Sequence, residues 1–295
     1  MSPARIIALT TLAMVAFAGN SLLCRVALKE TGIDAASFTT VRLISGALTL
    51  WLVVRLTRRG QSGRGNWLSA LALFAYAAGF SYAYVSLPAA SGALLLFGAV
   101  QATMIGHGLW AGERLRGPQL VGLVMAFAGL VGLLRPGLSA PPLSGSVLML
   151  GAGVSWGIYS LRGKGAGDPT RVTAGNFIRA VPVALVLSAA MSGGASVDAA
   201  GLGYAVLSGA LASGIGYAIW YTALPWLKAT NAATVQLSVP VIAAAGGIVF
   251  LGEPVTVRLA LASAAILGGV ALVILHKQRA APVAAPTPRT TPGRT

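Results

Sequence analysis

Long apolar stretches without charged side chains dominate this sequence. Of its 295 residues, 56% are hydrophobic and only 9% are charged, whereas soluble domains carry roughly 25% charged residues. An apolar run of about 20 residues can cross the hydrocarbon core of a bilayer as a helix, which satisfies its own backbone hydrogen bonds. The sequence therefore predicts an all-α integral membrane protein.

Proline, glycine and charge clusters divide the apolar sequence into predicted spans. There are ten, at residues 5–25, 35–56, 67–87, 90–111, 117–135, 144–162, 171–192, 200–223, 229–251 and 255–276. The first is interpreted as a retained helix and not as a signal peptide, because its counterpart later in the chain is internal. Residues 277–295 are rich in proline, threonine and alanine and are predicted to form a disordered cytoplasmic tail.

Lysine and arginine are concentrated in alternate loops. With a cytoplasmic N-terminus, 15 of the 21 basic residues lie in segments on the cytoplasmic side. This asymmetry follows the positive-inside rule and predicts that both termini are cytoplasmic. The net charge of +15 is also compatible with a nucleic-acid surface. However, the charges lie on short loops without interleaved aromatic residues, so no nucleic-acid partner is expected.

The two halves of the sequence repeat one pattern. The phrase "FSYAYVSLP" begins at Phe80, and "YAIWYTALP" begins 137 positions later at Tyr217. The same offset separates Arg42 in "VRLISGAL" from Arg179 in "FIRAVPVAL". Chance similarity between apolar helices is the alternative explanation. Ordered matches at rare residue types, including arginine, proline and tyrosine, favour a true repeat.

The repeat continues at the ends of the fourth and ninth spans, where "AGERLR" and "LGEPVT" align Glu113 with Glu253. We interpret the chain as one five-span unit written twice, over residues 1–137 and 138–276. Because five is odd, the second unit must cross the bilayer in the opposite sense. The prediction is thus ten transmembrane helices arranged as two inverted five-helix repeats, a pattern typical of transporters that alternate around one central site.

These features resemble the EamA group of the drug/metabolite transporter superfamily. The resemblance rests on the two five-span halves, the arginine-bearing second and seventh spans, and the Gly-Glu ends of the fourth and ninth spans. It implies transport across the bacterial inner membrane, with greatest similarity to exporters of aromatic and other amino acids. The first half departs from the family pattern, because "GAVQAT" lacks the span-four proline that the second half keeps as Pro240.

Polar and aromatic side chains in mid-span are expected to face a cavity or another helix, because lipid solvates them poorly. The candidate substrate-binding residues are Asn20, Ser21, Tyr76, Phe80, Phe97, Gln101, Trp156, Tyr159, Tyr217, Trp220, Tyr221, Gln236 and Ser238. Amides can donate to a carboxylate and accept from an ammonium group, and rings can stack on flat side chains. Interhelical hydrogen bonding and core packing are the alternatives at these positions.

Further residues are candidates for coupling or for mechanical roles. His107 is the one intramembrane side chain expected to titrate near neutrality, so it is a candidate for a proton-linked role or for a structural hydrogen bond. Structural or gating roles are assigned to Arg42, Arg179, Glu113, Glu253 and Pro240. The arginines are expected either to bind helix-end carbonyls or to share in binding a substrate carboxylate, and the glutamates are expected to pair with arginine.

The predicted function is export of small amphipathic metabolites, chiefly aromatic and other neutral amino acids, by alternating access. No acidic residue lies in mid-span, so a facilitator or uniporter is expected. The alternatives are a drug or other metabolite exporter and an integral-membrane transferase. The sequence has no HExxH, Walker loop or Cys/His set, so no enzyme activity, cofactor or metal is expected. The expected partners are a small-molecule substrate and the lipid bilayer, and the oligomeric state, monomer included, stays open.

Overall fold

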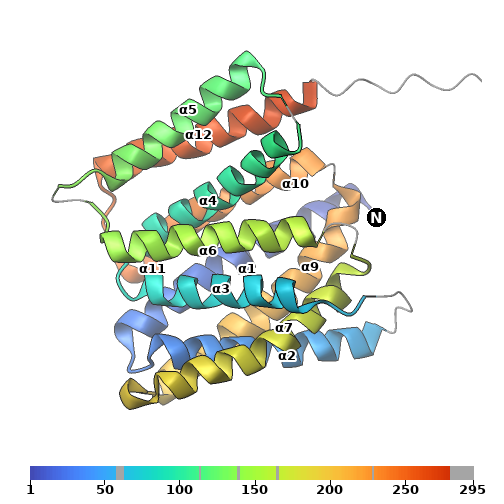
Figure 1. Cartoon of the computed structure of the whole chain (residues 1–295), viewed down its shortest axis with the longest axis vertical. Helices are drawn as coiled ribbons and strands as arrows, with labels where there is room; N and C mark the ends of the chain where they lie inside the picture. The colour runs from blue at the N-terminus through green and yellow to red at the C-terminus, as the bar shows by residue number, and fades with distance from the viewer. Residues whose placement is uncertain (58–62, 113, 138–139, 164–165, 228, 280–295) are drawn as a thin grey trace, which may run out of the picture.

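The computed structural model describes residues 1–57, 63–112, 114–137, 140–163, 166–227 and 229–279, and within these ranges it contains helices and turns but no strand (Figure 1). The α-helices are α1 (Pro3–Glu30), α2 (Ala35–Thr57), α3 (Trp67–Tyr84), α4 (Ala89–Trp110), α5 (Gly117–Leu134), α6 (Leu143–Arg162), α7 (Pro169–Ala190), α8 (Ala199–Leu207), α9 (Gly216–Ala223), α10 (Ala229–Gln236), α11 (Ser238–Leu251) and α12 (Val257–Arg279). A π-helix, η2 (Ser208–Ile215), joins α8 to α9, and short 3-10 turns are η1 (Ser192–Gly194) and η3 (Leu224–Trp226). The prediction of an all-α protein is confirmed for these residues, whereas the predicted tail lies outside them from residue 280 onward.

Eight of the ten predicted spans coincide with helical segments that are long and apolar enough to cross a membrane. The other two spans correspond to α3 and α6, in which tyrosine, serine, tryptophan and glycine lower the mean hydropathy. The outer surface of the bundle exposes large apolar side chains such as Phe127, Phe250 and Leu56. Such a surface would be costly in water and is suited to lipid.

The eighth and ninth spans are not uniform helices. The π-helix η2 interrupts the regular helix between α8 and α9, and π-helical segments occur frequently at functional sites. The ninth span, predicted as one run over 229–251, breaks at Leu237 into α10 and α11. The reason is Pro240, which has no N–H to donate to the carbonyl of Gln236. A tighter turn replaces the missing bond, with the Leu237 N–H donating to Thr234 O at 3.1 Å.

Helices α5 and α12 pack side by side at one edge of the bundle (Figure 1). Gly122 of α5 lies against Gly269 and Val273, whereas Gly129 further along α5 lies against Ala265. The residue numbers of the contacts rise along α5 as they fall along α12, so the two helices are antiparallel. They are the fifth span and its counterpart in the second half.

Helices α2 and α7 pack at the opposite edge, and they are also antiparallel (Figure 1). Thr40 donates to Ala184 O at 2.9 Å, whereas Gly46, later in α2, lies against Phe177, earlier in α7. These helices are the second span and its counterpart. Between the two edges, α6 packs on α3 and α4, while α1 packs on α9 and α11. Under the predicted repeat, α6 is the counterpart of α1, so the contacts of α6 with α3 and α4 correspond to those of α1 with α9 and α11.

Candidate functional site

A cavity of about 490 Å³ lies where α1, α3, α4, α6, α7, α9 and α10 meet. Its deep part is lined by buried side chains, including Asn20 and Phe80. Its other limit is the turn between α6 and α7, where the lining residues Gly163, Gly167 and Pro169 are exposed. The cavity therefore opens at the α6–α7 end of the bundle.

Nearly all of the predicted substrate-binding residues line this cavity. Those found there are Asn20, Ser21, Tyr76, Phe80, Phe97, Gln101, Trp156, Tyr159, Tyr217, Trp220, Tyr221 and Gln236. The exception is Ser238, whose hydroxyl donates to Val235 O at 2.6 Å beside the break between α10 and α11. This hydrogen bond to the backbone uses the hydroxyl as a donor, so Ser238 serves the local turn.

Aromatic rings from three helices form one wall of the cavity, with Trp156 of α6 at its centre. The Trp156 ring is stacked on Tyr217, with centroids 5.4 Å apart and an interplanar angle of 17°. Its centroid also lies 4.7 Å from that of Tyr76 and 5.2 Å from that of Tyr159. Ring pairs at these distances attract one another beyond the effect of burial. The wall is thus a preformed surface for a flat apolar group.

Some polar side chains in the cavity have no hydrogen-bond partner in the described part of the protein, and others have one. Gln101 is 6% exposed, and its side-chain amide makes no hydrogen bond to another residue in the described part of the chain. Among the same residues, the buried Ser213 hydroxyl of η2 also has no partner. The side-chain oxygen of Asn20, in contrast, accepts a hydrogen bond from the Ser208 hydroxyl at 2.6 Å. A buried donor or acceptor is costly when unpaired, so these groups are suited to a ligand or to water.

Several polar residues that line the cavity are not among the predicted ones. Thr173 and Asn176 of α7 both interact with the Tyr159 hydroxyl, at 3.2 and 3.5 Å. The Asn176 side-chain oxygen also accepts from the backbone N–H of Asn66 at 2.9 Å. Both residues lie near the start of the predicted seventh span, where polar side chains are common. Their three-residue spacing, which places them on one helix face, is the signal that could have identified them.

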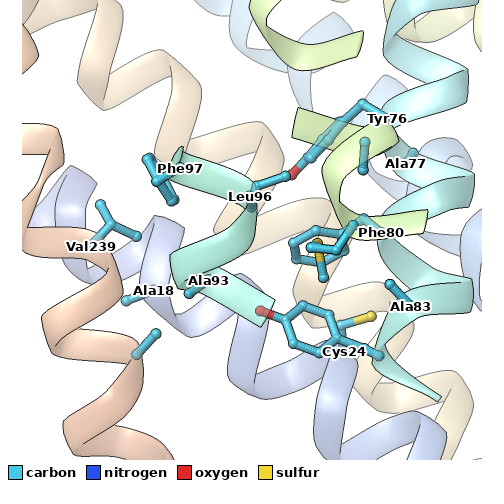
Figure 2. Close-up of a cluster of buried hydrophobic side chains, with 14 of the residues drawn as sticks. Ala18, Cys24, Tyr76, Ala77, Phe80, Ala83, Ala93, Leu96, Phe97 and Val239 are labelled. Carbon is cyan, nitrogen blue, oxygen red and sulfur yellow. The ribbon is translucent and has the colours of Figure 1, made fainter. Parts of the chain in front are cut away.

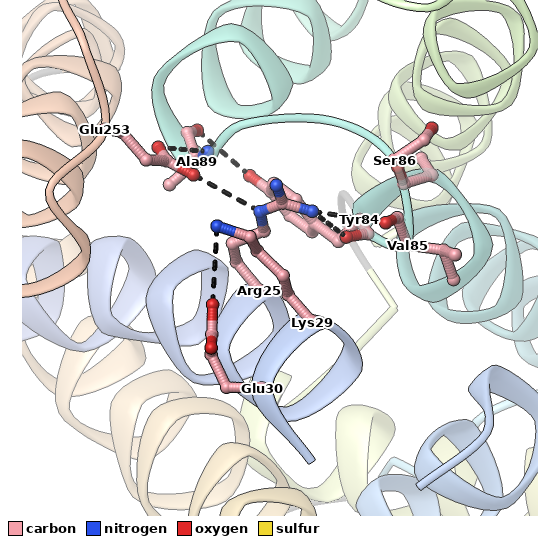
Figure 3. Close-up of polar contacts among 9 residues, drawn as sticks. Arg25, Lys29, Glu30, Tyr84, Val85, Ser86, Ala89 and Glu253 are labelled. Atoms are coloured by element: carbon pink, nitrogen blue, oxygen red, sulfur yellow. Dashed lines mark hydrogen bonds and ion pairs between the residues drawn. The ribbon is translucent and has the colours of Figure 1, made fainter. Parts of the chain in front are cut away.

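A buried ion pair lies beside the α3–α4 turn (Figure 3), at the end of the bundle opposite the α6–α7 turn (Figure 1). Arg25 Nε donates to Glu253 Oε1 at 3.2 Å, and Glu253 Oε2 accepts from the Ala89 N–H at 2.7 Å. Arg25 Nη1 also donates to the carbonyls of Tyr84 and Val85, at 2.9 and 3.2 Å. The predicted arginine partner of Glu253 is thus present. The network joins α1 to the α3–α4 turn and to the segment before α12.

Packed side chains lie between this ion pair and the cavity, and Figure 2 draws part of their cluster, including Phe80 and Cys24. Phe80 lines the cavity, and the Tyr84 ring lies edge-on to it with centroids 4.7 Å apart. Tyr84 and Cys24 are both 0% exposed. The structure is therefore closed at the ion-pair end and open at the α6–α7 end.

The remaining predicted residues that the structure describes lie outside the cavity lining. His107 is exposed on α4. Arg179 donates to the carbonyls of Arg64 and Gly175, at 2.5 and 2.8 Å. Glu113 lies outside the described residues. Among the residues that the structure covers, no three histidine, cysteine, aspartate or glutamate side chains gather as metal ligands.

Membrane-spanning helices around a cavity that is open at one end define a membrane transport protein. The profile of the EamA-like transporter family matches this chain twice, over residues 4–135 and 143–275. These matches cover most of the sequence, so the chain belongs to the EamA-like transporter family. The resemblance noted in the sequence is confirmed.

An uncharacterized protein of Pseudomonas aeruginosa is 58% identical to this chain over 275 residues, which are 93% of this chain and 96% of that protein. The threonine/homoserine exporter RhtA of Escherichia coli is 37% identical over 156 residues, which are 50% of this chain and 51% of the exporter. The RhtA of Salmonella typhimurium is 36% identical over 154 residues, or 49% of this chain and 50% of that exporter. The match therefore spans about half the length of these exporters. One crystal structure, 20% identical, shares the fold with a TM-score of 0.64 over 91% of this chain and 99% of its own.

Proposed function

We propose that this protein exports small amphipathic metabolites, chiefly amino acids with aromatic or other neutral side chains. The observation that carries the proposal is the cavity itself, which combines a stacked aromatic wall with the unpaired amide of Gln101. Rings bind a flat apolar side chain, and an amide can accept from an ammonium group or donate to a carboxylate. Similarity to threonine/homoserine exporters over about half the chain supports an amino acid as the cargo.

Alternating access between two inverted five-helix halves is the proposed mechanism. The antiparallel packing of α2 on α7 and of α5 on α12 supports an inverted arrangement, because each pair joins corresponding spans. The family profile matching each half supports the internal repeat. Two halves of one design can exchange conformations, which moves the opening of a central site from one face to the other.

The open end of the cavity is proposed to face the cytoplasm. Arg162 and Arg171 flank the α6–α7 turn at this end, and the positive-inside rule assigns such basic turns to the cytoplasm. This orientation gives an inward-open state in the bacterial inner membrane, with both termini inside. The Arg25–Glu253 pair then closes the outer end, and it must separate for release.

Transport is proposed to run down the substrate gradient. No aspartate or glutamate is found among the residues that line the cavity, and a proton-driven exchanger needs a titratable group in the pathway. Export from proteoliposomes loaded with phenylalanine should follow the phenylalanine gradient. Export that instead follows an imposed pH gradient would contradict the facilitator mechanism.

The cargo is tested by thermal stabilisation of the purified full-length protein. Ligands that bind the folded state raise its apparent stability, by about 2.7 kcal/mol when present at 100 times Kd. Neutral amino acids, aromatic ones first, should raise the melting temperature, whereas cationic dyes should not. Stabilisation by the dyes but by none of the twenty amino acids would replace this proposal with drug export.

A further inference from the structure

Arg42 lies in α2 directly behind the aromatic wall of the cavity. Its side chain is 1% exposed. Its guanidinium carbon lies 5.3 Å from the ring centroid of Tyr76 and 4.9 Å from that of Phe80. Both rings line the cavity. The positive charge is thus separated from the cavity by the thickness of these rings.

Most hydrogen-bonding capacity of this guanidinium is unused. Nη2 donates to the Tyr76 hydroxyl at 3.1 Å, whereas Nε and Nη1 are buried without a partner among the described residues. Among the residues that the structure describes, no carboxylate forms an ion pair with it. Arginine does not give up its proton in proteins. A buried, unpaired charge is costly, and the fold tolerates it only with a compensating gain.

Two other arginines of the spans, the buried Arg25 and the half-buried Arg179, have partners within the protein. Arg25 is paired with Glu253. Arg179, which stands at the equivalent position of the second half, donates to two backbone carbonyls. The repeat therefore keeps an arginine at both positions, but the protein satisfies only one of them. The missing acceptors for Arg42 must come from another molecule.

We propose that Arg42 anchors the carboxylate of the transported molecule. The carboxylate supplies the acceptors that Nε and Nη1 lack, and it reaches them when the Tyr76 ring turns aside. Contacts with two aromatic faces hold the guanidinium in place before binding. This inference rests on the proposed function and adds that the cargo is recognised through its carboxylate, while the amides Gln101 and Asn20 are left to the ammonium group.

The test compares phenylalanine with phenylalaninamide, which keeps the ring and the amine but replaces the carboxylate by a neutral amide. Binding to the purified full-length protein is measured by calorimetry at slightly acidic pH, where both amines are protonated. Wild type should bind the amino acid roughly tenfold to a hundredfold more tightly than the amide, as expected for hydrogen bonds to charged groups. Arg42→Gln should lose this preference, and Arg179→Gln should keep it.

The outcomes separate the two proposals. Equal binding of both ligands to wild type, or a preference that persists in Arg42→Gln, overturns the role of Arg42 and leaves amino-acid export standing. Binding of neither ligand by wild type, together with no stabilisation by any amino acid, overturns the proposed function itself and the carboxylate anchor with it. If Arg42→Gln fails to fold, a wild type without the preference still overturns the inference, and a wild type with it leaves the decision to a second variant at the same position.

A second variant distinguishes a ligand anchor from a structural arginine. Arg42→Met keeps much of the side-chain volume and removes the unpaired charge, and such replacements of buried charges are often neutral or stabilising. The melting temperature without ligand should therefore rise by a few degrees, while stabilisation by phenylalanine should be lost. A lower melting temperature without ligand would show that Arg42 serves the fold, and it would overturn the inference.

Discussion

At the scale of single residues, the cavity depends on side chains that only the fold brings together. The sequence identified Tyr76, Trp156 and Tyr217 because aromatic residues in mid-span have no interfacial explanation. It could not show that their rings meet, since they come from α3, α6 and α9. At Arg25 the prediction from sequence was wrong. Its charge ended the predicted first span at residue 25, but Glu253 neutralises it and α1 continues to Glu30.

Replacing the central ring should weaken binding of aromatic cargo. Trp156→Ala removes the stacking partner of Tyr217 and the neighbour of Tyr76. Loss of the contact between Trp156 and the ring of phenylalanine should cost about 1.4 kcal/mol of binding free energy, which corresponds to roughly tenfold weaker binding. The effect on threonine should be smaller, because threonine has no ring. Calorimetry on the purified protein measures both affinities. The matched control is Trp110→Ala, because Trp110 is 91% exposed and lies outside the cavity. Equal losses in the two variants would show that the wall does not contact cargo.

Two aspartates outside the spans make stability depend on pH. Hydrogen bonds from the backbone N–H groups of Gly32 and Gly201 hold the pKa of Asp198 below its usual value. For Asp34, burial raises the pKa, but hydrogen bonds from Ser37 and from two further backbone N–H groups outweigh it, so this pKa is also lowered. Each carboxylate therefore stabilises the fold above its unfolded pKa of about 3.9.

This stabilisation should disappear as the pH falls through the lowered pKa values of the folded state. Asp198→Asn keeps an oxygen that can cap α8 but removes the charge. The variant should melt below wild type at neutral pH, and the difference should shrink below about pH 4. Melting curves across this range measure it, with Glu30→Gln as a control at an exposed ion pair. A difference that is constant with pH would contradict the assignment.

At the scale of elements, the π-helix η2 is the feature that the sequence did not predict. The run 200–223 has the composition of an ordinary apolar helix, because a π-helical turn is decided by packing and not by residue type. Here η2 packs tightly on α2, where Gly209 faces Ser45 and the backbone of Arg42. The break at Leu237 could more easily have been predicted from the sequence, because Pro240 by itself excludes one backbone hydrogen bond.

The contact between η2 and α2 predicts the effect of one methyl group. In Gly209→Ala, the Cβ would collide with the Ser45 hydroxyl and with the carbonyl oxygen of Arg42. Overpacking of this kind costs about 1–3 kcal/mol, so the melting temperature should fall by several degrees. Gly203→Ala in α8 is the control, because its Cβ would meet nothing within 4 Å, and it should stabilise the helix by about 0.5–1 kcal/mol. If both variants melted alike, the close contact would have no energetic weight.

At the scale of the whole molecule, the positions of the spans followed from hydrophobic length and from turn residues. Helix α5, for example, begins at Gly117 and ends at Leu134, against a predicted 117–135. The pairing of α5 with α12 and of α2 with α7 could not be predicted in the same way, because small residues such as Gly122 and Gly46 set these contacts only in three dimensions. The predicted repeat relates the two, because it makes α12 the counterpart of α5 and α7 the counterpart of α2.

In the proposed arrangement the two halves of the protein cross the membrane in opposite directions, and labelling from each side of the membrane tests this. Single cysteines are placed at corresponding turns, Ala111→Cys after α4 and Val255→Cys after α11, in a Cys24→Ser background. Both positions are exposed, and Val255 is 56% exposed. A membrane-impermeant thiol reagent should reach Cys at 111 only from the cytoplasmic side and Cys at 255 only from the outside. Labelling of both positions from one side would contradict the inverted arrangement and the alternating mechanism built on it.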